Sequence, residues 1–170
     1  MGKDPGFPEK FISGLITLIK MNPMSGIEIL PFKPAHQAEA KNLILAGLEE
    51  HWGYLDPSKN ADLDDIISSY GGGLFLVALQ DEQVVGTGAI LPRNNNTAEI
   101  LRMSVANRMR RKGIGRMILD HLCDYARSIG CRQVILETTE TWQEVITFYE
   151  RYGFRVSHHL DGDVYFKLVL

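Results

Sequence analysis

The chain has 170 residues, of which 45% are hydrophobic and 23% charged, and these values fit one compact domain with a substantial core. The 18 lysine and arginine residues against 21 aspartate and glutamate residues give a formal net charge of −3, which excludes a globally cationic nucleic-acid-binding protein and leaves a local basic patch open. Two cysteines cannot form a disulfide framework and no apolar run approaches the ~20 residues that cross a bilayer, so a cytoplasmic protein without a membrane partner is expected.

Residues 1–24 are predicted to be an N-terminal extension rather than part of the domain. Apolar side chains recur there at helical spacing, at Phe11, Ile12, Leu15, Ile16, Leu18 and Ile19. This pattern favours a short helix that packs on the domain or on a partner. The acidic Asp4 and Glu9, and the lack of a small-residue cleavage site, argue against a secretory signal. The regular pattern starts later, and the domain is predicted over residues 25–170.

The first half of this domain is predicted to hold a strand, two helices and an antiparallel meander. The strand covers Ile27–Phe32, and Pro34 opens a helix that runs to about Glu50. After a loop over residues 51–62, Asp62 is expected to cap a short helix that ends before the Gly71-Gly72-Gly73 break. Three strands follow, at Leu74–Leu79, Val84–Leu91 and Thr97–Val105.

The second half predicts two more helices and three more strands. A helix over Ile114–Ile129 ends at Gly130, a left-handed cap, and a buried strand follows over Val134–Glu137. The capping-box spacing Thr141-x-x-Glu144 opens a helix that Gly153 stops. The last strands, Phe154–Leu160 and Val164–Leu170, flank the hairpin signal Asp161-Gly162. The fold class is therefore α/β, with a mixed, mostly antiparallel sheet of about seven strands and helices on both faces.

A basic, glycine-containing segment runs from Arg108 to Arg116. Its five positive side chains crowd the predicted start of a helix, where the macrodipole already provides positive potential. Such a local conflict is typical of a functional site. Gly113 and Gly115 allow a ligand to approach free N–H groups, which favours an anion such as a diphosphate. Neither a Walker-type phosphate loop nor a three-glycine dinucleotide fingerprint is present, and a solvated basic turn is the alternative.

These residues also resemble a known family. Arg110-x-x-Gly113-x-Gly115 matches Gln/Arg-x-x-Gly-x-Gly/Ala, the acetyl-CoA signature of the GNAT N-acetyltransferase superfamily. A strand ending in residues 101–105 precedes this signature. The segment 148–154 follows and is similar to the family's Phe-Tyr-x-x-x-Gly-Phe. The order of predicted elements from Ile27 to Leu170 is also similar to the GNAT fold.

The resemblance implies a binding site for acetyl-CoA without a metal. In GNAT proteins the backbone amides of the glycine-rich turn hold the CoA diphosphate, and the end of the preceding strand pairs with the pantetheine arm. An amide in that strand is also implied as the donor that stabilises the oxyanion. The residues at the matching positions are Met103, Ser104, Val105, Arg110, Arg111, Lys112, Gly113, Ile114, Gly115 and Arg116.

Tyr149 occupies the position of the family's general acid, which protonates the departing thiolate. Its spacing alone favours core packing, because Trp142, Val145 and Ile146 share its helical stripe. The family context reverses that preference. Trp142 and Val145 depart from the family's pattern, which often has an asparagine and an alanine at these positions in contact with the cofactor.

Glu99 is the candidate general base. Strand alternation predicts that it shares a face with Leu101, Met103 and Val105, and a carboxylate on an apolar face suits a base near neutral pH. Many GNAT enzymes carry such a glutamate. A bulge is common in this strand of the family and would change the parity, and a solvent-facing glutamate is the alternative.

The resulting interpretation is an N-acetyltransferase that moves an acetyl group from acetyl-CoA to a primary amine by direct attack in a ternary complex. The acceptor is a small molecule or a peptide. A non-catalytic CoA-binding or interaction module on the same fold is the alternative, and a basic turn that holds nucleic-acid phosphates is a weaker one. Family members often form homodimers, so a homodimer is also considered. A cationic acceptor is weakly favoured by the acidic residues Glu49, Glu50, Asp56, Asp62, Asp64 and Asp65, beside the aromatic Trp52, Tyr54 and Tyr70.

Overall fold

A computed structural model describes residues 26–170 of the chain. The helix expected within residues 1–24 lies outside the described residues. The described strands are β1 (Ile27–Pro31), β2 (Leu74–Gln80), β3 (Gln83–Pro92), β4 (Thr97–Val105), β5 (Gln133–Thr139), β6 (Arg155–Leu160) and β7 (Asp163–Val169). The α-helices of this part are α2 (Gln37–Trp52), α3 (Ile66–Tyr70), α4 (Ile114–Ser128) and α5 (Gln143–Tyr152). Short 3₁₀ turns cover Pro34–His36, Pro57–Lys59, Ala61–Leu63 and Asn107–Met109.

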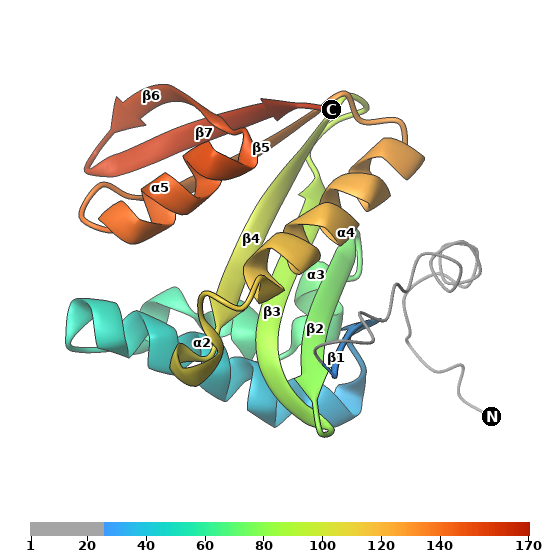
Figure 1. Cartoon of the computed structure of the whole chain (residues 1–170), viewed down its shortest axis with the longest axis vertical. Coiled ribbons are helices and arrows are strands. Elements are labelled where there is room, and N and C mark those ends of the chain that lie inside the picture. Colours follow the sequence, from blue (N-terminus) through green and yellow to red (C-terminus); the bar gives the residue numbers. More distant parts are fainter. Residues whose placement is uncertain (1–25) are drawn as a thin grey trace.

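The described strands form one sheet in the order β1-β2-β3-β4-β5-β7-β6 (Figure 1). Neighbouring strands are antiparallel except β4 and β5, which are parallel because helix α4 connects them. The predicted mixed, mostly antiparallel sheet of about seven strands is therefore confirmed. No helix within residues 26–170 is long and apolar enough to cross a membrane.

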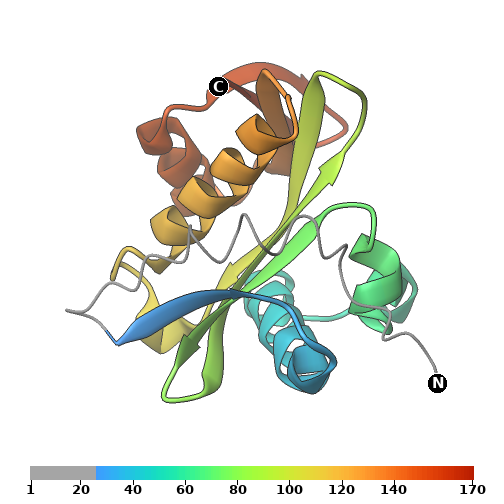
Figure 2. The same cartoon turned by 90° about the vertical axis from the view of Figure 1, so that its right-hand side faces the viewer.

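Helices cover both faces of the sheet (Figure 2). Helices α4 and α5 pack on one face, and α2 and α3 pack on the other. The neighbours Phe75 and Leu76 show how β2 serves both layers: Phe75 is buried in the cluster under α2 and α3, and Leu76 in the cluster under α4. This double burial explains why β2 is a continuous apolar run instead of an alternating one.

Helix α4 lies close against β3 because that strand contains glycine at the crossing point. A Cβ atom added to Gly88 would lie 2.5 Å from Ile118 Cγ2 and 2.7 Å from the Met103 sulfur. Any side chain at position 88 would therefore push α4 away from the sheet. The close approach brings the start of α4 next to the end of β4.

The two tight hairpins lie at predicted turns. Asp81 and Glu82 connect β2 to β3, and Asp161 and Gly162 connect β6 to β7, all four with positive φ (49°, 64°, 52° and 88°). Positive φ at both central residues matches the right-handed twist of the strands. Gly130 (φ 86°) follows α4 as predicted.

Two predicted helix caps were wrong. Asp65, instead of Asp62, is the N-cap of α3, and its carboxylate accepts a hydrogen bond from Ser68 N–H. The N-cap of α5 is Trp142, and the Thr141 hydroxyl contacts His51 instead of capping the helix. In both cases a long-range partner binds the side chain that the local pattern assigned to the cap.

The two halves of the sheet are covered unequally. The face of β5 and β7 that carries Val134 and Phe166 is buried under α4 and α5. Side chains on the opposite face are half-buried or exposed, and the exposed ones are Glu137, Lys167 and Val169, the last with 73% of its surface accessible. Every residue of β6 is exposed. The half-sheet β5-β7-β6 thus has a core on one face only.

Candidate active site

Strands β4 and β5 separate at the centre of the sheet. They pair only over Thr97–Glu99 and Gln133–Ile135. Beyond these pairs β4 continues to Val105 and β5 to Thr139 without pairing to each other, and Figure 1 shows the two strands diverging. We call this divergence, over residues 100–105 and 136–139, the splay. Its carboxyl-terminal edges carry unpaired backbone groups and lead into the loops before α4 and α5.

A β-bulge lies in β4 within the splay. The pairing to β3 shifts between Thr87 and Ala89, and Arg102, opposite this shift, has a left-handed φ of 54°. The Thr87 hydroxyl donates to Arg102 O at 2.8 Å. The bulge reverses the side-chain parity of the strand. Leu101 packs in the cluster under α2, whereas Met103 packs under α4.

Because of the bulge, the environment of Glu99 differs from the one that the sequence predicts. Glu99 and Leu101 precede the bulge and share the α2 face by alternation. Met103 and Val105 follow the bulge and pack against the other cluster. The prediction that Glu99 shares a face with all three residues was therefore wrong for Met103 and Val105.

The end of β4 turns backbone groups toward the splay. Ala106 N–H donates to Val85 O on β3 at 2.9 Å, so alternation directs the N–H and C=O of Val105 to the opposite edge. The Arg110 Nε–H, which donates to Val105 O at 3.2 Å, approaches from that edge. By the same alternation the backbone groups of Met103 face the splay, and those of Ser104 face β3.

The loop before α4 presents a run of unpartnered amides. Arg111 and Gly113 both have positive φ (63° and 83°), and the first helical hydrogen bond of α4 runs from Met117 N–H to Gly113 O at 3.0 Å. Among the described residues, none accepts a hydrogen bond from the N–H groups of Arg111, Lys112, Gly113, Ile114, Gly115 and Arg116. Free amides at a helix start, with the positive end of its dipole, form a site for an anion such as a diphosphate.

Two residues of the signature have structural partners that the sequence did not reveal. The Arg110 guanidinium donates to both carboxylate oxygens of Glu50, at 2.9 and 2.8 Å, and this hydrogen bonding lowers the pKa of Glu50. Asn107 Nδ2 also donates to Glu50, at 3.0 Å. A Cβ atom at Gly115 would lie 3.1 Å from the Phe148 ring, so this glycine also permits the contact between α4 and α5.

The last turn of α2 also contacts the loop after β5, at the other edge of the splay. The His51 ring stacks on Trp142, with centroids 4.2 Å apart and planes at 7°, and His51 Nε2 lies 3.1 Å from Thr141 Oγ1. We call the contacts of Glu50 with Arg110 and of His51 with Trp142 the α2 bridge. It joins the loop after β4 to the loop after β5 at the open end of the splay. Sequence reasoning placed Trp142 on the helical stripe of Tyr149 and noted it as a departure from the family's pattern, but it missed the contact with His51.

Tyr149 is nearly enclosed in the core beside the splay. Its ring packs against Phe148, Phe154 and Phe166, and only 5% of its surface is accessible. Its hydroxyl makes no hydrogen bond to residues 26–170 and keeps some solvent access, because His121 Nε2 is the one fully buried, unpartnered side-chain polar atom among these residues. Burial raises the pKa of the phenol above its ordinary value of 10, so the group is protonated at physiological pH. It is a proton donor for which none of the described residues is an acceptor.

Glu99 lies where β4 and β5 begin to separate, paired in register with Ile135. Its carboxylate accepts a hydrogen bond from Arg93 Nε, and the Glu99 side chain is only 19% exposed. The guanidinium therefore occupies one carboxylate oxygen. The remaining lone pairs of the Glu99 carboxylate are open to a second hydrogen-bond donor, such as a water molecule.

The acidic residues of the predicted acceptor region are largely paired within the protein. Arg102 donates to both oxygens of Asp62 at 2.9 and 2.5 Å and to Asn60 Oδ1 at 3.1 Å, and Tyr70 donates to Asp62 at 2.6 Å. Burial alone would raise the pKa of Asp62, but the hydrogen bonds from Arg102 and Tyr70 outweigh it and lower that pKa. Other carboxylates are bound by Arg110 (Glu50), Lys41 (Asp64), Ser58 (Asp56) and Ser68 (Asp65). Cations thus compensate Glu50, Asp62 and Asp64, whereas Asp56 and Asp65 keep their negative charge because their serine partners are neutral.

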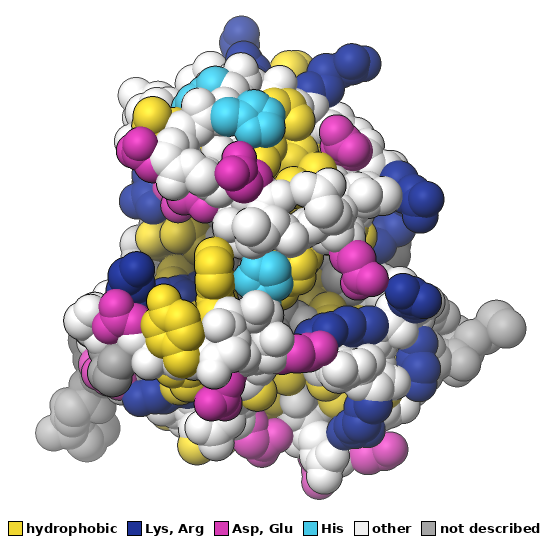
Figure 3. All heavy atoms as spheres, turned by 90° about the vertical axis from the view of Figure 1, so that its left-hand side faces the viewer, with side chains coloured by type: hydrophobic (Ala, Val, Ile, Leu, Met, Phe, Trp, Pro, Cys, Tyr) yellow, Lys and Arg dark blue, Asp and Glu magenta, His cyan; other side chains and the backbone are white. Residues whose placement is uncertain are grey.

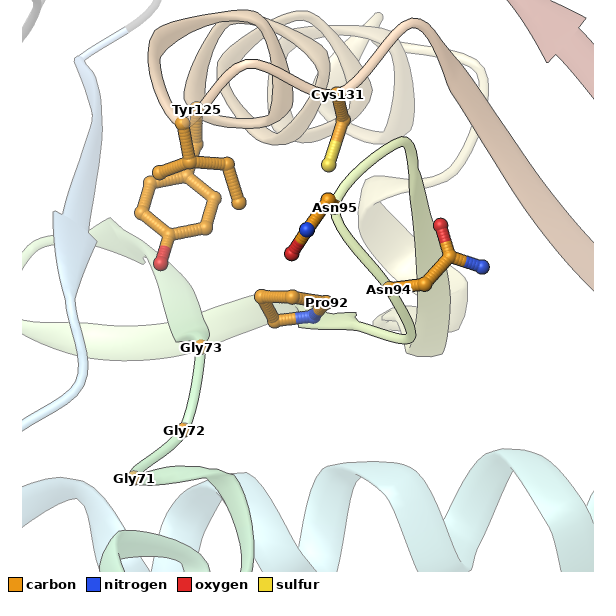
Figure 4. A pocket seen from close by; sticks show the side chains of 9 residues that line it. Gly71, Gly72, Gly73, Pro92, Asn94, Asn95, Tyr125 and Cys131 are labelled. Carbon is orange, nitrogen blue, oxygen red and sulfur yellow. The ribbon is translucent and has the colours of Figure 1, made fainter.

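A cavity lies at the opposite end of the sheet (Figure 4). It has a volume of about 240 Å³ and is lined by the glycine turn before β2, the β3–β4 turn and the end of α4. Tyr125 and Cys131 point toward it from the α4 side, and Pro92 and Asn95 face them. This cavity contains none of the predicted site residues. In the described part of the chain no three potential metal ligands come together.

Comparison with known proteins identifies the family. The model of the acetyltransferase (GNAT) family matches residues 42–154, and the chain belongs to this family. Human N-acetyltransferase 8B is 30% identical over 124 residues, which are 68% of this chain and 55% of that protein. Rat N-acetylaspartate synthetase is 36% identical over 106 residues, 60% of this chain and 36% of that protein. The chain thus spans about half, or less, of the length of these curated relatives.

Solved structures share the fold at lower identity. A GNAT-family acetyltransferase from Staphylococcus aureus superposes with a TM-score of 0.77 at 24% identity, over 85% of this chain and 99% of that one. The PaiA N-acetyltransferase from Thermoplasma acidophilum, solved in complex with coenzyme A, superposes with a TM-score of 0.74 at 18% identity, over the same shares. These likenesses show that the sheet and its helices have the GNAT arrangement.

Proposed function

We propose that the chain is an acetyl-CoA-dependent N-acetyltransferase that acts on a primary amine of a small molecule or peptide in a ternary complex. One observation carries this proposal: six successive amides at the start of α4, from Arg111 to Arg116, are without a partner in residues 26–170 and adjoin the splay. This is the donor set that a diphosphate requires. Membership of the GNAT family and the chemistry of Tyr149 support the same function.

The proposed binding site follows the β4 edge into the loop before α4. The amides of Arg111 to Arg116 hold the diphosphate, with Arg110 fixing the loop through Glu50. The splay-facing backbone groups of Met103 and Val105 pair with the pantetheine arm, and Ser104 lies between them. When bound, acetyl-CoA supplies an acetyl group activated as a thioester. A backbone N–H near Val105 stabilises the negative charge that develops on the acetyl oxygen.

The proposed proton transfers use one residue from each side of the splay. As the amine nitrogen bonds to the acetyl carbon and the carbon–sulfur bond breaks, Tyr149 donates its proton to the departing sulfur. Glu99, through water, takes the proton that the amine nitrogen loses. Exchange with solvent then returns Tyr149 and Glu99 to their starting states. Holding both reactants in one site makes the attack effectively unimolecular, which supplies much of the acceleration.

The acidic residues near α2 and α3 and the named relatives bear on the acceptor. Because Lys41, Arg102 and Arg110 already pair with three of the six carboxylates near α2 and α3, only the other three are left to favour a cationic amine. One relative is named for the acetylation product of an amino acid, so amino acids belong among the candidates. The cytoplasmic location, the homodimer and the absence of nucleic-acid and membrane partners stay predictions.

Two measurements test the proposal. Isothermal titration with acetyl-CoA, with duplex DNA as the comparison, measures the binding site. A thiol-release assay over amino acids, polyamines, lysine peptides and aminoglycosides measures transfer. Binding of acetyl-CoA together with amine-dependent thiol release is the expected result. Binding without release for any amine would favour the non-catalytic module, and no binding at millimolar acetyl-CoA would overturn both.

A further inference from the structure

The two halves of the splay carry different parts of the proposed reaction. The β4 half holds the backbone donors near Val105 and the Glu99 carboxylate. The other half holds Tyr149, which packs on Phe154 and on Phe166 of β7. Since β4 and β5 share only three residue pairs, the distance between these groups depends on contacts elsewhere.

On one face of the sheet, helices α4 and α5 make those contacts. Tyr152 on α5 donates to Asp120 on α4 at 2.8 Å, and the Arg116 guanidinium lies 5.6 Å from the Tyr152 ring centroid. Phe148 packs against the backbone at Gly115. These contacts join the two halves on the α4 face of the sheet, and they do not span the α2 face.

On the α2 face, the α2 bridge provides the connection. Glu50 binds Arg110 after β4, and the next residue, His51, stacks on Trp142 after β5. The stack is nearly parallel, at 7°, and the contact between His51 and Thr141 holds the imidazole in place. Because residues 50 and 51 are neighbours on a regular helix, a rigid element spans the opening. Figure 3 shows this side of the molecule, with a histidine and apolar side chains side by side near its centre.

We propose that His51 and Trp142 are positioning residues that set the width of the splay, and thereby the placement of Tyr149 relative to the acetyl-binding edge of β4. This inference rests on the proposed acetyl transfer. The His51–Trp142 half of the bridge acts on the chemical step rather than on diphosphate binding, because the amides from Arg111 to Arg116 belong to the β4 half alone. Misplacement of reacting groups by about 1 Å costs on the order of 100-fold in rate.

The test compares His51→Ala with His36→Ala, the same change at the other end of α2, where the ring lies edge-on to Phe32. His51→Ala is expected to lower kcat roughly tenfold or more, while the Kd for CoA changes less than about threefold. His36→Ala keeps kcat at the wild-type value. His51→Phe retains a stacking ring and is expected to recover most of the loss. A kcat unchanged in His51→Ala, or a Kd that rises as much as kcat falls, overturns the inference.

A spectroscopic readout tests the stack without turnover. The chain has two tryptophans, so Trp52→Phe leaves Trp142 as its single tryptophan. Adding His51→Ala to this variant is expected to change the Trp142 emission, and adding His36→Ala is not. Equal spectra for all three variants would overturn the bridge, even if the wild-type enzyme transfers acetyl groups. A wild-type protein that releases no thiol with any amine would instead overturn the proposed function, and the positioning role with it.

Discussion

The Arg110 guanidinium binds both oxygens of the Glu50 carboxylate, so the arginine of the acetyl-CoA signature points to helix α2 and not to the free amides that follow it. Its Nε–H also donates to Val105 O. Arg110 thus connects three segments: the end of β4, the loop before α4 and the last turn of α2. We expect Arg110 to contribute to CoA binding indirectly, by holding the loop before α4 in one conformation.

This indirect role predicts similar effects for Arg110→Ala and Glu50→Ala. An exposed ion pair contributes at most about 1 kcal/mol, so each change is expected to raise the Kd for CoA no more than about fivefold. The double variant should lose less than the sum of the single ones, because both changes remove the Arg110–Glu50 contact, and each removes only one further hydrogen bond, to Val105 O or from Asn107. Titration of the three variants measures this. A large loss in Arg110→Ala alone would show that the guanidinium contacts CoA directly.

Gly113→Ala is expected to weaken CoA binding by distorting the amide run. Gly113 has a φ of 83°, and although a Cβ atom there would meet nothing within 4 Å, alanine disfavours this backbone by about 1–2 kcal/mol. Relaxation of the strain would turn the neighbouring amides away from the diphosphate. Gly130→Ala is the matched control, with a φ of 86° and equally open space. Gly130→Ala should lose a similar amount of thermal stability but keep the wild-type Kd for CoA. Equal Kd values for Gly113→Ala and Gly130→Ala would contradict the assignment of the amides from Arg111 to Arg116 to diphosphate binding.

Tyr149→Phe is expected to bind acetyl-CoA normally and lose about 100-fold or more in kcat, because it lacks the proposed proton donor. Tyr152→Phe, on the same helix, removes a hydroxyl that hydrogen-bonds Asp120, and it should affect folding stability more than kcat. Thiol-release kinetics and titration separate the two effects. Normal turnover by Tyr149→Phe over the working pH range would exclude the phenol from the reaction.

The raised pKa of Tyr149 also makes a prediction for alkaline stability. The folded protein keeps the phenol protonated while the unfolded chain ionises it near pH 10, so the stabilisation is complete below pH about 10 and is lost as the pH rises further. The free energy of unfolding should therefore fall more steeply above pH 10 in the wild type than in Tyr149→Phe. Urea unfolding at pH 8 to 11 measures the difference, and parallel curves would show that the phenol is not enclosed.

Asp62→Asn is expected to destabilise the fold by about 2 kcal/mol, between the values for exposed and buried ion pairs, because it leaves Arg102 partly buried without its partner. The lowered pKa of Asp62 gives the sign of the pH effect. The stabilisation is present above its ordinary value of 3.8 and disappears as the pH falls through the lower, folded value. The two proteins should therefore converge in acid. Asp64→Asn, which removes an exposed pair with Lys41, should cost less than about 1 kcal/mol.

Glu99→Gln is expected to lower kcat/KM, and most strongly at low pH, where little of the amine is unprotonated and base assistance matters most. Arg93→Gln removes the partner and keeps the carboxylate, so it should retain the wild-type pH profile. Rates of thiol release from pH 6 to 9 measure both variants. An unchanged profile in Glu99→Gln would remove this residue from the mechanism.

The fold was largely predictable because its signals are local. Runs of apolar residues marked the strands of the meander β2-β3-β4, and the turn residues Asp161 and Gly162 marked the last hairpin. The basic turn around Gly113 was predictable for the same reason, since its glycines and charges are contiguous.

The partners that cross the molecule were not predictable. Nothing in the sequence near Thr141 or Asp62 shows that His51 and Arg102 lie beside them, and these contacts displaced the expected helix caps. The bulge at Arg102 likewise arises from pairing with β3, so the parity of Glu99 relative to Met103 required the structure. Local patterns specify elements, whereas tertiary contacts decide which side chains are free.

The unequal covering of the sheet has a consequence for its local unfolding. The half-sheet β5-β7-β6 has a core on one face, and it joins β4 through the pairs Thr97–Glu99 and Gln133–Ile135 alone. Its amide hydrogens should exchange with deuterium sooner than those of β2 and β3, which are buried on both faces. A ligand that fills the splay would join the two halves, so slower exchange in β5 and β7 would report its arrival.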